Sequence, residues 1–169
     1  LLKLVEVHYS IITGATNPIL RSVADPIENF TEDIKQLALD MKLVCHEEDG
    51  VGLAAPQIGL SVRIIYTSQW KNTPKGLKFL SDQIMINPHI TAKSTTMNKD
   101  VEWCLSLPGI EWLVKRYDWI KVKFQDATGK KLTKTYKDFD ARIIQHEIDH
   151  LDGILFIDKL VKSKEKIKI

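Results

Sequence analysis

The chain has 169 residues, of which 44% are hydrophobic and 27% are charged. This length and balance are typical of one globular domain over residues 1–169 and exclude a disordered or fibrous chain. The 24 basic and 22 acidic side chains leave a net charge of only +2. Such a small charge gives no indication of DNA binding, and no apolar run is long enough to span a membrane.

The cysteine content bears on the compartment. Two cysteines, Cys45 and Cys104, are too few for a disulfide framework and favour a reducing environment. A cytoplasmic protein is therefore expected. An organelle is the alternative if a targeting peptide has been removed, since the first residue is Leu1 and not methionine.

The first clear helix is predicted over residues 31–48. Asn29 and Glu32 resemble a capping box at its start. Apolar side chains recur at helical spacing and are expected to face the core: Ile34, Leu37, Met41 and Val44.

Residues 49–59 form an unusual segment directly after this helix. They contain three glycines, two adjacent alanines and a proline, but no phosphate-loop pattern. Small residues allow a second backbone or a ligand to approach closely, so a packed strand that lines a site is predicted. Gln57 is the one amide in this apolar setting. Two roles stay open for it: a structural bridge, or a donor to a developing oxyanion.

Several later stretches are predicted as strands from their apolar patterns. They are residues 62–66, 84–88, 119–124, 131–136 and 154–157, with an alternating stretch over 101–109 that breaks at Pro-Gly. The polar residues 68–82 and 93–100 are predicted as loops.

A second helix is predicted over residues 140–152, and it carries His-Glu-x-x-His. His146 and His150 are four residues apart, so both imidazoles leave one helix face and can bind one metal ion. Glu147 lies beside them as a carboxylate able to move a water proton. The alternative is a chance motif on a solvated helix, but the neighbouring apolar residues indicate a buried one.

A metal needs at least one more protein ligand. The extended zinc-peptidase pattern would require a third histidine where Phe156 stands, and a distal glutamate would have to be Glu165 in the lysine-rich end. Cys104 is therefore the best remaining candidate for the third ligand.

Three segments together resemble the motifs of the peptide deformylases. They read Gly-Val-Gly-Leu-Ala-Ala-Pro-Gln over 50–57, Glu-Trp-Cys-Leu-Ser over 102–106, and Gln-His-Glu-Ile-Asp-His over 145–150. The resemblance covers nearly the whole chain. One residue departs from the family pattern, because Trp103 stands where the family has glycine. A tryptophan there is expected to narrow the entry, alter substrate preference or lower activity. We also expect Glu102 and Arg116 to form an ion pair that steadies this strand.

The resemblance implies an α+β fold, with antiparallel sheets wrapped around a central metal-binding helix in a single domain. It implies hydrolysis of the N-formyl group from the N-terminal methionine of new polypeptides, with release of formate. The implied cofactor is Fe(II), with zinc, nickel or cobalt as substitutes. Formylmethionyl nascent peptides are the implied partners, with a transient ribosome contact, no DNA and no membrane. A monomer is the default.

By matched position, the resemblance also implies roles for single residues. The implied metal ligands are Cys104, His146 and His150, and the implied catalytic residues are Glu147, Gln57 and the Leu105 N–H. The implied substrate contacts are Val51, Gly52, Phe139 and Ile143, with His146 beside the methionine pocket. Two other functions stay open: a metallopeptidase of another class, and a non-catalytic relative that binds formylmethionine or the ribosome.

Overall fold

The structure is a computed structural model that describes residues 9–161. It contains two α-helices, α1 (Glu32–Glu47) and α2 (Asp138–Leu151), and two short 3-10 helices, η1 (Ala55–Ile58) and η2 (Phe156–Lys159). Its strands are β1 (Gly52–Ala54), β2 (Ile64–Thr73), β3 (Gly76–Lys93), β4 (Met97–Trp103), β5 (Glu111–Tyr117), β6 (Trp119–Gln125) and β7 (Lys131–Lys137). In the described part, no helix has both the length and the hydropathy to cross a membrane.

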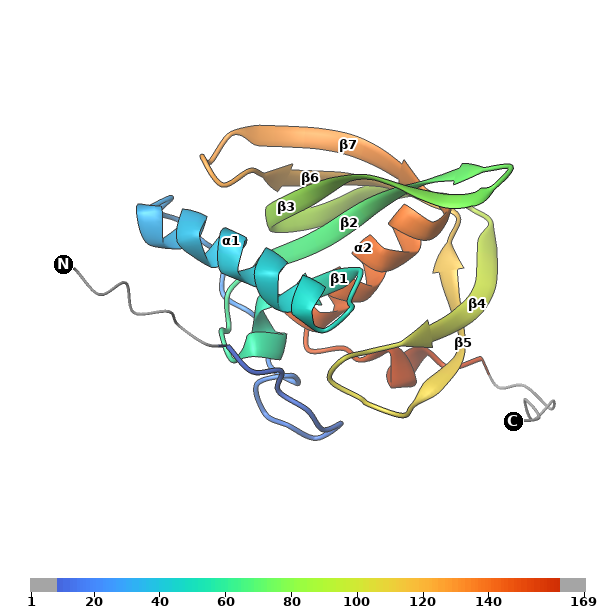
Figure 1. The fold of residues 1–169 in the computed structure, drawn as a ribbon, viewed down its shortest axis with the longest axis horizontal. Coiled ribbons are helices and arrows are strands. Elements are labelled where there is room, and N and C mark those ends of the chain that lie inside the picture. Colours follow the sequence, from blue (N-terminus) through green and yellow to red (C-terminus); the bar gives the residue numbers. More distant parts are fainter. Residues whose placement is uncertain (1–8, 162–169) are drawn as a thin grey trace.

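The strands form two antiparallel sheets around α2. The larger sheet has the order β1-β2-β3-β6-β7, and β4 pairs only with β5 in the smaller one. Figure 1 shows α2 between the larger sheet and the β4–β5 pair, while α1 lies against the β1–β2 end. The predicted α+β fold with sheets wrapped around a central helix is therefore confirmed.

Strand alternation divides the core into two layers. On β2 and β3, Ile65 and Met85 face α2, where they pack with Ile148. Their neighbours Ile64 and Ile86 point to the opposite face and pack against α1. As a result α2 is covered on nearly every side, and all its residues from Ala141 to Leu151 are buried.

The predicted boundaries of α1 and the β6–β7 hairpin are confirmed within a few residues, but four local predictions were wrong. Residues 68–82 are largely the β2–β3 hairpin, and 93–100 include the start of β4. The outer part of that hairpin is solvated on both sides, so its sequence lacks the apolar alternation that marks a strand. The N-cap of α1 is Thr31, without a capping side chain.

The fourth error concerns residues 154–157, which do not form a strand. The chain turns into η2 because the Asp158 carboxylate accepts a hydrogen bond from the Leu155 N–H at 2.9 Å. The same carboxylate pairs with Arg21, which fixes the turn against the N-terminal segment. The lysine-rich end that contains Glu165 lies outside the described residues.

Candidate metal centre and catalytic pocket

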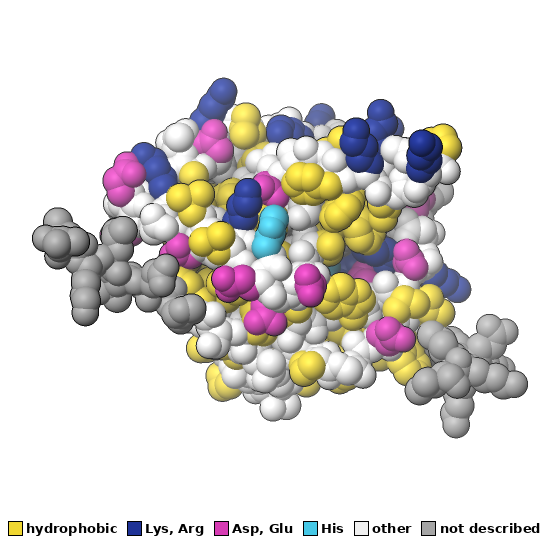
Figure 2. All heavy atoms as spheres, viewed as in Figure 1, with side chains coloured by type: hydrophobic (Ala, Val, Ile, Leu, Met, Phe, Trp, Pro, Cys, Tyr) yellow, Lys and Arg dark blue, Asp and Glu magenta, His cyan; other side chains and the backbone are white. Residues whose placement is uncertain are grey.

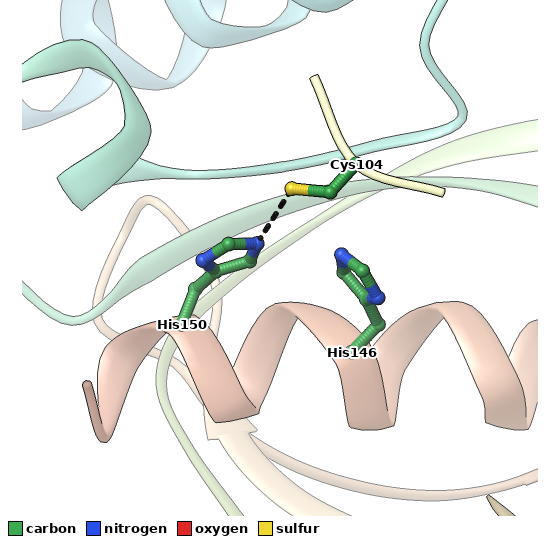
Figure 3. Close-up of side chains that lie close together, drawn as sticks. All are labelled: Cys104, His146 and His150. Carbon is green, nitrogen blue, oxygen red and sulfur yellow. Dashed lines mark hydrogen bonds between the residues drawn. The ribbon is translucent and has the colours of Figure 1, made fainter. Parts of the chain in front are cut away.

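Two histidines leave the same face of α2 and point to one spot. His146 and His150 are one helical turn apart, and their ring centroids are 5.0 Å from each other. Both side chains are buried, because the sheet lies on one side of α2 and the β4–β5 pair on the other. Figure 3 shows the two rings facing Cys104, which follows the end of β4.

The three predicted ligands meet at this spot. The Cys104 sulfur lies 3.2 Å from His150 Nε2, and one donor atom of each residue lies within 4.8 Å of the other two. Cysteine and histidine donors suit zinc and other transition metals of intermediate softness. The residue types and their mutual distances therefore fit a metal ion.

The surroundings of His146 support the same conclusion. Its Nδ1 lies 2.9 Å from Glu102 Oε2, and such a carboxylate orients the ring so that Nε2 is left for a cation. Burial lowers the pKa of His146, but hydrogen bonds to Cys104 and Glu102 outweigh it and raise the pKa to about 10. The spot thus favours a positive charge, which a metal ion would supply.

Glu147 faces the pocket beside the three ligands. Burial raises its pKa to about 7, and its Oε2 atom has no hydrogen-bond partner among the described residues. A carboxylate with a pKa near neutrality can both accept and return a proton. Its position depends on Gly52, because a Cβ added there would lie 2.5 Å from Glu147 Oε1. Glycine is required here for the close approach of β1 to α2.

Gln57 reaches the same centre from η1. The Ala54 N–H donates to its Oε1 at 2.8 Å, which fixes the amide orientation. Its Nε2 then donates to Ser106 Oγ at 3.3 Å and to the Cys104 sulfur at 3.5 Å. The side chain is therefore a structural bridge and also has its N–H groups directed at the ligand cluster, so the two predicted roles do not exclude each other.

A buried network of charges stands behind the metal ligands. The predicted Glu102–Arg116 pair is confirmed as a bidentate contact with two distances of 2.8 Å. Arg116 also pairs with Asp149, while Arg142 Nη1 donates to Glu102 Oε1 at 2.7 Å. Although burial raises the pKa of Glu102, its partners Arg116 and His146 hold that pKa well below the usual range.

Sequence reasoning missed two members of this network, Arg142 and Asp149. Their signal was present, since both are charged residues within a helix segment predicted to be buried, where charges require partners. The sequence of the helix does not indicate which residues those partners are. They come from β4 and β5, which are distant in the sequence.

The metal centre opens into a pocket of about 110 Å³. The residues expected to contact substrate all line it: Val51, Gly52, Phe139 and Ile143, together with Leu105. Trp103 is also among the lining residues, and half of its side chain is exposed. Figure 2 shows hydrophobic side chains gathered around this hollow, between β4 and the β2–β3 hairpin.

Comparison with known proteins identifies the family. The family model of polypeptide deformylase matches residues 9–166. A peptide deformylase of Thermus thermophilus is 42% identical over 158 residues, which cover 89% of this chain and 81% of that protein. A peptide deformylase of Orientia tsutsugamushi is 40% identical over 162 residues, with 93% and 89% coverage.

Solved structures agree with the sequence relatives. A class I type b peptide deformylase from Acinetobacter baumannii, with Met-Ala-Ser bound, has a TM-score of 0.84 at 33% identity and covers 91% of this chain and 99% of its own. The Plasmodium falciparum enzyme has a TM-score of 0.81 at 37% identity, with 90% and 87% coverage. Neither alternative function finds support in these matches. The chain belongs to the polypeptide deformylase family, whose metal-dependent hydrolases remove the N-formyl group from newly made polypeptides.

Proposed function

We propose that Cys104, His146 and His150 hold a ferrous ion, which zinc, nickel or cobalt can replace. The thiolate and imidazole donors support this choice, because they accept all of these metals. When bound, the ion supplies a Lewis acid for the formyl carbonyl and lowers the pKa of water. A ferrous site with a thiolate ligand is also expected to lose activity in air through oxidation.

In this proposal Glu147 moves the proton. Its carboxylate takes a proton from the attacking water and returns it to the amine that leaves. The elevated pKa supports a group that exchanges protons near neutral pH. The Gln57 amide and the Leu105 N–H donate hydrogen bonds to the oxyanion that develops on the formyl group. Loss of one such donor typically lowers kcat by about a hundredfold or more.

The pocket holds the methionine residue of the substrate. Phe139, Ile143 and Val51 supply apolar contacts for its side chain, and the backbone at Gly52 pairs with the peptide. The Acinetobacter relative solved with Met-Ala-Ser, the peptide that is left when formyl-Met-Ala-Ser loses its formyl group, supports a methionyl peptide as the occupant of the pocket. We also propose one catalytic domain over 1–169 that acts as a cytoplasmic monomer with a transient ribosome contact.

The observation that carries the proposal is the position of Glu147 beside the Cys-His-His cluster. The test is formate release from formyl-Met-Ala-Ser by ferrous protein prepared without oxygen. Glu147→Gln should keep the metal, because no ligand changes, and should lose turnover by several orders of magnitude. Turnover that survives in this variant would refute the assigned role. Metal analysis tests which ion is bound, sedimentation tests the monomer, and co-sedimentation with ribosomes tests the ribosome contact.

A further inference from the structure

The pocket lies between two strands that each have an unpaired edge. In the described chain β1 pairs only with β2, and β4 pairs only with β5. Residues of both strands line the pocket, namely Gly52 on β1 and residues 101–103 on β4. An extended peptide can lie along such edges with its backbone hydrogen-bonded to them. The inference below rests on the proposed function, with the formyl group at Cys104 and the methionine side chain directed inward.

The alternation of side chains along β4 then indicates which way the residue after formylmethionine points. Glu102 is 5% exposed and points into the protein toward His146 and Arg116, whereas Val101 and Trp103, which also line the pocket, are 41% and 50% exposed on the opposite face of β4. A peptide that follows this edge alternates in the same way, because successive side chains of a strand point to opposite faces. With methionine inward, the residue after it points outward and lies beside Trp103.

The exposed face of the β4–β5 pair carries an acidic group next to Trp103. Glu111 of β5 is the register partner of Trp103, and cross-strand partners share a face with Cβ atoms about 5 Å apart. Glu111 is exposed and has no ion-pair partner among the described residues. Lys99 and Lys115 are register partners on the same face. Lys99 lies four residues before Trp103 along β4, which is roughly 13 Å away.

A side chain that starts at the free edge of β4 must cross the indole to reach Glu111. Two strand spacings separate the peptide from β5, roughly 10 Å in all. Lysine and arginine have the longest side chains, and their apolar stems lie readily on apolar surfaces while the charged head stays solvated. Their cationic groups are also attracted by the face of a tryptophan ring.

We propose that Trp103 and Glu111 form a subsite for the residue after formylmethionine, and that it favours arginine or lysine. The stem lies on the indole, and the cationic head meets the Glu111 carboxylate. A large apolar residue gains the indole contact alone. An acidic residue gains neither and is repelled by Glu111.

The test uses formyl-Met-X-Ser peptides in which X is arginine, leucine, alanine or glutamate, with the ferrous enzyme. For the wild type, kcat/KM should be about three- to tenfold higher for arginine than for alanine, intermediate for leucine and lowest for glutamate. The differences should fall mainly on KM, because this contact is remote from the reacting atoms.

Matched variants separate the two contacts. Trp103→Ala should reduce the preference for both arginine and leucine, whereas Trp103→Phe should keep the preference for leucine. Glu111→Gln should reduce only the arginine preference and the discrimination against glutamate. Glu28→Gln, an exposed change of the same chemistry before α1, should leave all ratios unchanged.

Two results would overturn the subsite: ratios within twofold for the wild type, or an arginine preference that persists in both Trp103→Ala and Glu111→Gln. If formate is released from all four peptides at similar kcat/KM, only the subsite is contradicted. A failure to release formate from every peptide would overturn the proposed function and the subsite with it.

Discussion

Replacement of Gly52 by alanine tests how tightly β1 positions the proposed general base. The added Cβ would lie 2.5 Å from Glu147 Oε1 and 2.9 Å from Ile143 Cγ2. Ordinary contact begins near 3.4 Å, so the carboxylate or the strand must move by about 0.9 Å. The backbone at Gly52 has no positive φ, so alanine brings a steric conflict without backbone strain.

A displacement of about 1 Å at a catalytic group typically lowers the rate about a hundredfold. We therefore expect Gly52→Ala to reduce kcat for formyl-Met-Ala-Ser by roughly that factor, with the metal content unchanged because no ligand is touched. The free energy of unfolding should fall by about 1–3 kcal/mol, as in other overpacked sites. These quantities are measured by formate release, metal analysis and denaturant unfolding.

The control is Gly14→Ala, since a Cβ there meets nothing within 4 Å. Its φ of +109° makes alanine strained, so it should lose some stability but keep kcat. If Gly52→Ala keeps kcat within threefold of the wild type, Glu147 is not positioned by β1 as the structure implies. A rise in KM alone would lead to the same conclusion.

Three further predictions concern the cluster and its charges. Cys104→Ser should lower metal affinity, measured by competition with a chelator, and an unchanged affinity would remove Cys104 from the ligand set. Arg116→Met should destabilise the fold by about 3–5 kcal/mol in urea, because it leaves Glu102 and Asp149 buried without their cation. Despite burial, Arg116 and His146 hold the pKa of Glu102 below its usual 4.5, so its stabilisation is full above pH 4.5 and declines as the pH falls. The urea midpoint of the apoprotein should therefore fall more steeply between about pH 5 and pH 3 for the wild type than for Glu102→Gln, and parallel curves would contradict this.

Sequence patterns predicted strands best where one face of the strand is buried and the other is exposed. Buried and exposed side chains alternate along the whole of β6, because one face packs on α2 and the other is solvated, and Leu132 and Tyr136 continue the covered face on β7. The β2–β3 hairpin was predicted as a loop in its outer part, since both faces of that ribbon meet water and no alternation is selected. Patterns of this kind describe the environment of a strand, so a strand with a uniform environment leaves no periodic signal.

By itself, the sequence determined the chemistry of the centre. His146 and His150 share a helix face whatever surrounds them, and Glu147 is fixed beside them by the same helical geometry. The tertiary structure decided which residues from other elements surround these three side chains. It brought Cys104 and Gln57 from other elements, placed Glu102 behind His146, and closed the charge network through Arg116 and Arg142. Contacts between residues far apart in the chain depend on strand register and packing, which no local pattern specifies.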